Sequence, residues 1–177
     1  MTTATRVLVS AGSKHGSTLD IASRIADVLA EGGLDVDLRA PEEVAELAGY
    51  AAIVIGSSVY AGHWQANAKE LAGRIGSCDP LPLVWLFSSG PLGDPPKPVE
   101  DPVDVASIVE TTSARDHRLF AGSLDKAKLS FGERAIVAAL RAPEGDFRDW
   151  DEISRWADEI TDTLRAGSIS ITEPSVL

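Results

Sequence analysis

Short apolar runs separated by polar turns recur along the chain. Five of them are bounded by turn residues and predict β-strands at Arg6 to Ser10, Val36 to Arg39, Ala51 to Gly56, Leu83 to Phe87 and His117 to Ala121. Three of the runs read VLV, AIVI and LVWLF, continuously apolar rather than alternating. Continuous runs of this length are typical of parallel strands that are buried on both faces.

Apolar residues at helical spacing fill much of the sequence between the predicted strands. Start signals for helices occur at Ser17 to Asp20, which resembles a capping box, at Asp101 to Asp104 (DPVD) and at Asp149 to Glu152. The helical stripes are Ile21, Ile25, Val28 and Leu29, then Val105, Ile108 and Val109, then Phe131, Ala135, Ile136, Ala139 and Leu140, and finally Ile153, Trp156, Ile160 and Leu164.

Strands that alternate with helices predict an α/β fold, with one parallel sheet covered on both faces. The 177 residues suit a single domain, which we place at residues 1–166. Residues 167–177 show no packing pattern, so we expect a mobile C-terminal tail. The proline-rich stretch from Gly90 to Pro102 is predicted to be a long functional loop inside the fold.

Composition and net charge exclude some classes of function. The net charge of −11 argues against non-specific nucleic-acid binding and is compatible with docking on a basic partner or simply with a soluble surface. The single cysteine, Cys78, excludes an internal disulfide. Neither a transmembrane run nor a signal segment is recognisable, so we expect a cytoplasmic protein. We expect no metal site.

The connection after the first predicted strand, Ser13 to Thr18 (SKHGST), is rich in hydroxyl groups. It precedes a helix, whose N-terminal N–H groups attract anions, and Gly16 allows close approach of the backbone. Lys14 precedes the glycine, which disagrees with a Walker loop, and the three glycines of a dinucleotide fingerprint are missing. The connection therefore predicts a site for one phosphate monoester. The alternative is an ordinary serine-capped helix with a solvated loop.

Two further polar segments follow predicted strands. The first, GSSVYAGHWQ from Gly56, brings Tyr60, His63 and Trp64 close together, and the second, SSGPLG, begins at Ser88. Carboxyl ends of parallel strands meet at one edge of a sheet, so we expect all three segments to form one pocket there. Its ligand would be phosphorylated and flat, unless Tyr60 and Trp64 instead pack beneath the loop.

These motifs resemble the flavodoxin-like family, over roughly Arg6 to Arg165. SKHGST is similar to the family's phosphate loop, and GSSVYAG is similar to its second flavin loop, with Tyr60 at the place of a stacking aromatic residue. The resemblance implies a three-layer sandwich with a five-stranded parallel sheet in the order 2-1-3-4-5. It also implies non-covalently bound FMN. The segments SKHGST, GSSVYAGHWQANAKE, LFAGSLD and GDFRDWDEI resemble a subgroup related to menaquinone-dependent protoporphyrinogen dehydrogenase.

The resemblance assigns cofactor binding to three groups of residues. They are Ser13, Lys14, His15, Gly16, Ser17 and Thr18 for the phosphate, Ser57, Ser58, Val59, Tyr60, Ala61 and Gly62 along the ring, and Ser88, Ser89, Gly90, Pro91, Leu92 and Gly93 at the pyrimidine end. His15 and His63 are candidate proton donors with ordinary pKa values near 7, or simply surface histidines. No catalytic residue is assigned, because a flavin carries the redox chemistry itself.

Three functions remain open. The first is an oxidoreductase that passes electrons between a reduced donor and a quinone or porphyrinogen-like substrate, with peripheral membrane contact through the quinone. The second is a flavodoxin-type carrier that docks on redox proteins; it is favoured by the acidic charge, but Pro91 and Leu92 stand where carriers usually place an aromatic residue. The third is a non-redox module without flavin. The chain could act as a monomer or as a homodimer.

Overall fold

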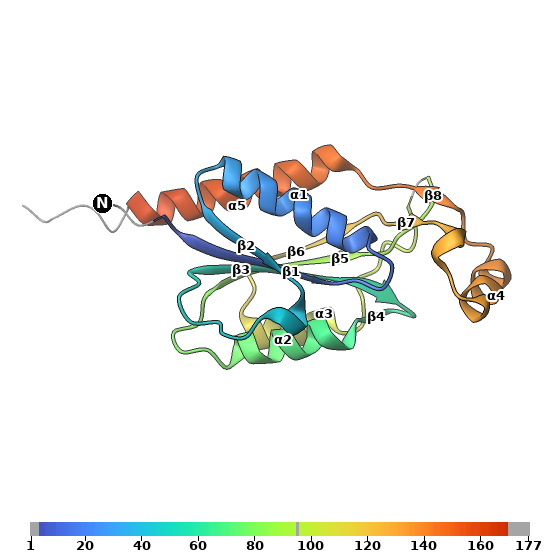
Figure 1. The fold of residues 1–177 in the computed structure, drawn as a ribbon, viewed down its shortest axis with the longest axis horizontal. Coiled ribbons are helices and arrows are strands. Elements are labelled where there is room, and N and C mark those ends of the chain that lie inside the picture. Colours follow the sequence, from blue (N-terminus) through green and yellow to red (C-terminus); the bar gives the residue numbers. More distant parts are fainter. Residues whose placement is uncertain (1–3, 95, 170–177) are drawn as a thin grey trace, which may run out of the picture.

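The computed structural model describes residues 4–94 and 96–169. The strands and helices follow one another along the chain as shown in Figure 1. They are β1 (Arg6–Gly12), α1 (Ser17–Glu31), β2 (Asp35–Arg39), the 3₁₀ turn η1 (Pro41–Glu43), β3 (Ala52–Tyr60), β4 (His63–Trp64), α2 (Ala66–Gly76), β5 (Leu83–Ser89), α3 (Val105–Thr112), β6 (Asp116–Phe120), β7 (Ser123–Leu124), the 3₁₀ turn η2 (Lys126–Lys128), α4 (Phe131–Leu140), β8 (Gly145–Asp146) and α5 (Trp150–Ile169).

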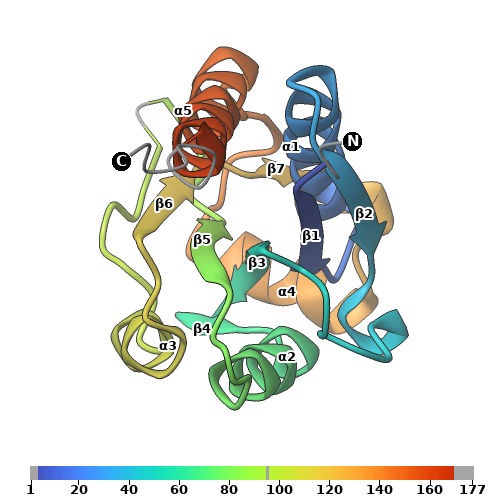
Figure 2. The ribbon, with the colours of Figure 1, turned by 90° about the vertical axis from the view of Figure 1, so that its left-hand side faces the viewer.

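Five parallel strands form the central sheet, in the order β2-β1-β3-β5-β6, and β4 pairs antiparallel with the end of β3. Helices α1 and α5 cover one face of the sheet, and α2 and α3 cover the other (Figures 1 and 2). The predicted three-layer α/β sandwich is therefore confirmed. The predicted order 2-1-3-4-5 is confirmed as well, since the five main strands follow it when the short β4 is left out.

The two faces of the sheet carry separate apolar cores. Val7 and Val9 of β1 belong to the core beneath α1 and α5, whereas Leu8 belongs to the core beneath α2 and α3. This is why the run VLV is continuously apolar. In the first core, the rings of Phe120 and Trp156 meet edge to face, with centroids 5.5 Å apart.

Three strands continue beyond their predicted ends. β1 runs through Gly12 rather than ending at Ser10. β3 runs through Tyr60 and β5 through Ser89, so Ser57, Ser58 and Ser88 are strand residues and not turn residues. Parallel pairing continues across these hydroxyl residues, with Ser57 opposite Ser88 and Ser58 opposite Ser89. The expectation that the polar segment from Gly56 follows the strand was therefore wrong, because its first five residues continue β3. The chain turns later and forms a hairpin with β4.

The helix starts agree only in part with the capping signals. α1 begins after Gly16 without a side-chain cap, so the expected capping box at Ser17 is wrong. α3 begins at Val105 and not near Asp101. Asp104 stands at its N-cap position, but the Asp104 carboxylate accepts a hydrogen bond from the backbone N–H of Trp64 instead of capping the helix. Asp149 does cap α5, where its Oδ1 accepts a hydrogen bond from Glu152 N.

The end of α5 corrects the predicted tail. The helix extends to Ile169, so residues 167–169 are helical rather than a mobile tail. Within this last turn, the hydroxyl of Ser168 donates a hydrogen bond to the carbonyl oxygen of Leu164. The remaining residues of the expected tail, 170–177, lie outside the described part of the chain.

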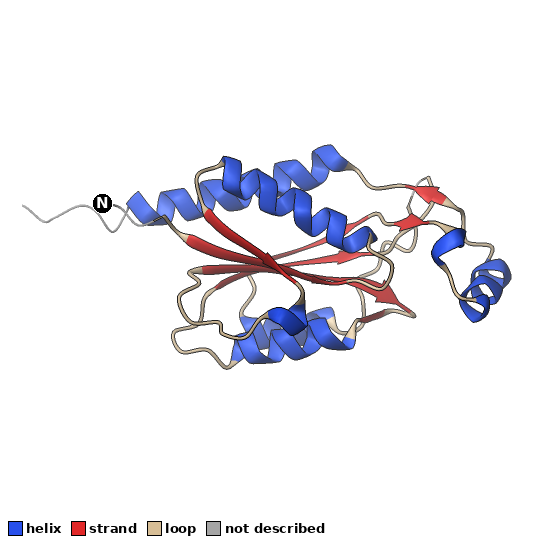
Figure 3. Cartoon of the chain, in the orientation of Figure 1, coloured by secondary structure: helices blue, strands red, loops and turns tan. Residues whose placement is uncertain are grey.

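A segment between β6 and α5, residues 121–149, stands apart from the sandwich. Its two ends pair as the short antiparallel strands β7 and β8, and α4 lies beyond them at the end of the molecule (Figures 1 and 3). The sequence predicted α4 as a helix but not its position. Within the described residues, no helix is long and apolar enough to cross a membrane.

Candidate functional site

A pocket of about 460 Å³ lies at the carboxyl end of the sheet. The loop after β1, the ends of β3 and β5 and the inner side of α4 enclose it. The predicted site residues that line it are Ser13, Lys14, His15, Ser17, Thr18, Ser58, Val59, Tyr60, Ala61, Ser89, Gly90 and Leu92. The structure therefore brings the three predicted polar segments together at one edge of the sheet.

The loop after β1 presents a turn with an open side to this pocket. Gly16 adopts φ 91°, a left-handed conformation that favours glycine, and a Cβ built on it would meet no atom within 4 Å. The Ser13 hydroxyl accepts a hydrogen bond from Gly16 N at 3.0 Å, which closes the turn. The first N–H groups of α1 lack partners within the helix and are available to an anion.

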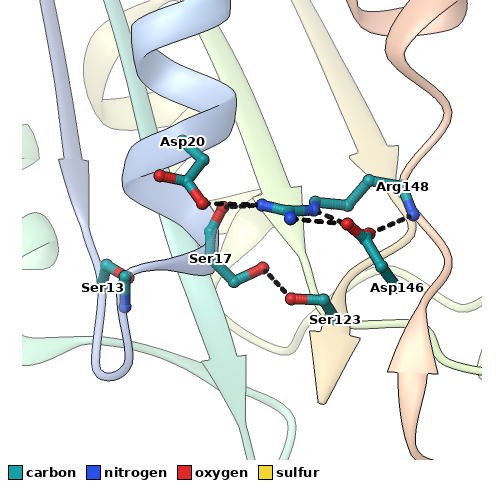
Figure 4. A network of polar contacts seen from close by, with 7 residues as sticks. Ser13, Ser17, Asp20, Ser123, Asp146 and Arg148 are labelled. Atoms are coloured by element: carbon teal, nitrogen blue, oxygen red, sulfur yellow. Dashed lines mark hydrogen bonds and ion pairs between the residues drawn. The ribbon is translucent and has the colours of Figure 1, made fainter. Parts of the chain in front are cut away.

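Ser17 takes part in a second network, on the outer side of the same loop (Figure 4). Its hydroxyl lies 2.9 Å from that of Ser123, and its carbonyl oxygen accepts a hydrogen bond from Arg148 Nη1 at 3.1 Å. The guanidinium of Arg148 also pairs with Asp20 at 3.0 Å and with Asp146 at 2.7 Å. These contacts hold the segment 121–149 against the start of α1, and no local sequence pattern predicted them.

Glu133 of α4 reaches the loop after β1 from the opposite side. Its carboxylate lies 2.5 Å from Lys14 Nζ and 3.2 Å from His15 Nε2. Hydrogen bonds from Lys14 and from the backbone of Ser130 lower the pKa of Glu133 from its usual value of 4.5 to about 2. Lys14 Nζ also lies 4.3 Å from the centroid of the Tyr60 ring, a cation–π contact.

The wall formed by β3 holds a polar group that the protein itself does not satisfy. Ser58 Oγ is buried, and it has no hydrogen-bond partner among the described residues. A buried hydroxyl without a partner is costly. Because Ser58 also lines the pocket, a ligand with a polar edge there would remove that cost.

Two other predicted residues, Ser57 and Ser88, lie behind the wall. Ser57 Oγ accepts a hydrogen bond from Gln65 N at 2.8 Å. Ser88 Oγ accepts one from Trp64 Nε1 at 2.8 Å and lies 2.8 Å from His117 Nε2. Burial lowers the pKa of His117. The side chains of these serines therefore support the site from beneath, and Trp64 packs in the core as the alternative interpretation expected.

The remaining predicted residues lie near the pocket without lining it. Gly62 and Pro91 line a neighbouring hollow of about 350 Å³ beneath the proline-rich loop, and Gly93 lines a wider groove. His63 faces away and lies 3.2 Å from Asp104, so its surface interpretation agrees with the structure. No group of metal-ligating side chains occurs in residues 4–94 and 96–169.

Sequence reasoning missed the roof of the pocket. Leu129, Ile136, Val137 and Leu140, on η2 and α4 or beside them, close it from the outside. The apolar stripe of α4 indicated a helix, but periodicity alone says nothing about which partner a helix covers. The pocket consequently combines a polar end, formed by the loop after β1, with an apolar roof.

The family model of the flavodoxin domain matches residues 8–151. The chain belongs to the flavodoxin-like family. The match includes the loop after β1, the pocket wall and the whole segment 121–149. No curated protein matches the chain in sequence.

Solved flavodoxin structures share the fold at low sequence identity. A flavodoxin from the domain Archaea superposes with a TM-score of 0.60 at 15% identity, covering 90% of this chain and 99% of that one. Oxidised flavodoxin 2 from Bacillus cereus gives a TM-score of 0.59 at 17% identity, covering 89% and 99%.

Part of a larger oxidoreductase has a similar fold. Rubredoxin:oxygen oxidoreductase from the anaerobe Desulfovibrio gigas gives a TM-score of 0.62 at 15% identity, covering 92% of this chain. This chain spans 36% of that protein's length. The resemblance therefore concerns one part of that enzyme, and at this identity it shows the fold alone.

Proposed function

We propose that the protein is an FMN-binding oxidoreductase that passes electrons between a reduced donor and a quinone or porphyrinogen-like substrate. The observation that carries this proposal is the pocket itself, which joins an anion-binding loop to a wall with an unsatisfied hydroxyl and to an apolar roof. A phosphate monoester attached to a flat ring with polar edges fits these three parts together. Membership in the flavodoxin-like family supports FMN as that ligand.

Each part of the pocket has a distinct role in this proposal. The N–H groups at the start of α1 and the hydroxyls of Ser13 and Thr18 would hold the phosphate. Ser58 would donate its hydroxyl to a polar edge of the ring, and Tyr60 would pack beside the ring. FMN, when bound, supplies the redox chemistry, so the protein's task is to bind, orient and tune it.

The roof favours a flat apolar substrate over a purely protein-to-protein carrier. Ile136, Val137 and Leu140 line the pocket and give it an apolar side. An apolar wall is the usual lining of sites for flat, poorly soluble molecules. The subgroup resemblance to menaquinone-dependent protoporphyrinogen dehydrogenase supports the same substrate class.

A flavodoxin-type carrier is the second candidate, and the net charge of −11 favours it. Such a surface would dock on a basic redox partner. The two candidates differ in electron number. A one-electron radical that persists during reductive titration would favour the carrier, whereas direct two-electron reduction with fast quinone turnover would favour the enzyme.

The test of the proposed function begins with FMN binding. The purified protein is mixed with FMN, excess is removed, and the absorbance and fluorescence spectra are recorded. We expect retained flavin bands with quenched fluorescence. A protein that stays colourless would contradict both redox candidates and favour the non-redox module.

A double variant then tests the phosphate site. Ser13→Ala with Thr18→Ala should weaken FMN binding at least tenfold, since both hydroxyls lie at the anion-binding loop. The matched control is Ser77→Ala with Thr163→Ala, whose hydroxyls donate to carbonyl oxygens within their own helices and lie outside the pocket. Parental affinity in the first variant would contradict the assigned phosphate site.

A further inference from the structure

The helix α4 is apolar around most of its circumference, yet it is not buried. None of its residues is buried, and the side chains of Phe131 and Leu140 are 91% and 74% exposed. A helix that is apolar all round is normally enclosed by protein or lipid. The pocket beneath α4 accounts for only part of its apolar surface.

The two sides of α4 have different surroundings. Glu133, Ile136 and Val137 line the pocket. At 100° per residue, Phe131 and Ala138 lie on the opposite side of the helix, away from the pocket. α4 also projects at the end of the molecule, beyond the sheet and the four covering helices (Figures 1 and 3). The outer side is therefore available for a contact outside the chain.

The segment around α4 differs in charge from the rest of the protein. Residues 126–141 contain four cationic side chains and one carboxylate, a net charge of +3 in a chain of net charge −11. The carboxylate, Glu133, points inward to Lys14. Lys126 has an acidic neighbour, Glu144, at 3.9 Å, and both side chains are half exposed, so solvent weakens this pair. The cationic residues are Lys126, Lys128, Arg134 and Arg141.

We propose that segment 126–141 docks on an anionic lipid bilayer, with α4 lying in the interface. A cationic, apolar helix with an exposed aromatic residue has the composition of an interfacial helix. Phe131 would enter the boundary between headgroups and acyl chains, and the four cations would meet anionic headgroups. The complementarity of charge is local, because the rest of the surface is acidic and would be repelled by the same lipids.

This orientation would place one opening of the pocket beside the bilayer. Leu140 lines the pocket and is also largely exposed, so it lies where the pocket meets the outside. A lipid-soluble substrate would then reach the roof without crossing water. The docking itself does not depend on flavin, so its test is separate from that of the proposed function.

The experiment is co-sedimentation of the full chain with vesicles. We expect binding to vesicles of phosphatidylcholine with 30% phosphatidylglycerol, weaker binding at 0.5 M salt, and little binding to phosphatidylcholine alone, because headgroup charge provides much of the attraction. FMN-free and FMN-saturated protein should bind alike. No sedimentation with either vesicle, or equal sedimentation with both, would overturn the proposal.

Two pairs of variants distinguish this helix from the general surface. Lys128→Glu with Arg141→Glu should weaken vesicle binding by about tenfold or more, whereas Arg155→Glu with Arg165→Glu, the same charge change on α5, should not. Phe131→Ser should also weaken binding, whereas Leu81→Ser, at another exposed apolar position, should not. Equal losses of vesicle binding in the test and control variants would overturn the proposal. The proposal would also be overturned if segment 126–141 bound an acidic protein and not lipid.

Discussion

The carboxylate of Glu133 forms a 2.5 Å ion pair with the ammonium group of Lys14. It joins the first turn of α4 to the loop after β1, two segments that are distant in the sequence. The same carboxylate accepts hydrogen bonds within its own helix start, from Ser130 N at 2.8 Å. The position of the pocket roof is thus fixed to the loop that we assign to phosphate.

The pH dependence of stability should reveal this contact. The pKa of Glu133 is lowered from 4.5 to about 2, so its ionised form stabilises the folded state. The contribution should be complete above about pH 4.5 and disappear as the pH falls toward 2. We expect the difference in free energy of unfolding between the parent and Glu133→Gln to shrink across that range, measured by urea titration at each pH.

Glu110→Gln is the control for this measurement, because Glu110 lies exposed on α3, away from the pocket. Its difference from the parent should not follow the same profile. If Glu133→Gln differs from the parent equally at pH 7 and pH 2, the ion pair with Lys14 is not the source of its effect.

Arg148 should anchor the whole segment 121–149. Its side chain is 10% exposed and bonds to Ser17 O, Asp20 and Asp146. Arg148→Ala should lower the free energy of unfolding by about 1–2 kcal/mol, a value reduced because the two carboxylates are half exposed or more. Amide hydrogen exchange in residues 121–149 should rise more than elsewhere. Arg155→Ala is the control, and a matching rise there would contradict the anchoring role.

The turn at Gly16 should resist an added side chain for conformational reasons alone. Its φ of 91° disfavours alanine by about 1–2 kcal/mol, and no neighbour would clash with the new Cβ. Gly16→Ala should therefore lower stability by about that amount, whereas Gly16→Asn should cost less, because asparagine tolerates this conformation. Thermal or urea unfolding measures the loss of stability in each variant. Equal losses in Gly16→Ala and Gly16→Asn would contradict the conformational explanation.

Gly56 differs from Gly16 because it has no space for an added side chain. A Cβ on Gly56 would lie 2.2 Å from Cζ of Phe87, its partner on β5. Gly56→Ala should lower the free energy of unfolding by about 1–3 kcal/mol through overpacking. Gly73→Ala, on an open helical position, should instead raise it by about 0.5–1 kcal/mol. In the Phe87→Leu background, the cost of Gly56→Ala should fall; an unchanged cost would exclude the clash.

Much of the fold could be predicted because the sheet is buried on both sides. Val7, Leu8 and Val9 face alternate cores, and such runs identify a covered parallel strand without any alignment. Strand ends were harder to predict. Ser57 and Ser58 look like turn residues, but pairing between strands decides where a strand ends, and pairing is not visible in one local stretch of sequence.

The candidate site could also be predicted only in part. The loop from Ser13 to Thr18 could be identified because its chemistry is local. The ion pair of Glu133 with Lys14 could not, because it depends on how the segment 121–149 folds back over the sheet. Likewise, Ser88 looked like a ligand contact, but its hydroxyl meets Trp64 and His117, residues that come from other elements.

The strands β7 and β8 pair with each other, Ser123 opposite Asp146 and Leu124 opposite Gly145. The chain therefore leaves the sandwich and returns to it at nearly the same point. A single insertion between these two strands would be enough to add α4 to an open flavodoxin-like domain, and a single deletion would remove it. Replacing residues 125–144 with a two-residue turn should therefore remove α4 and leave the sandwich intact, which circular dichroism and urea unfolding of the shortened protein would check.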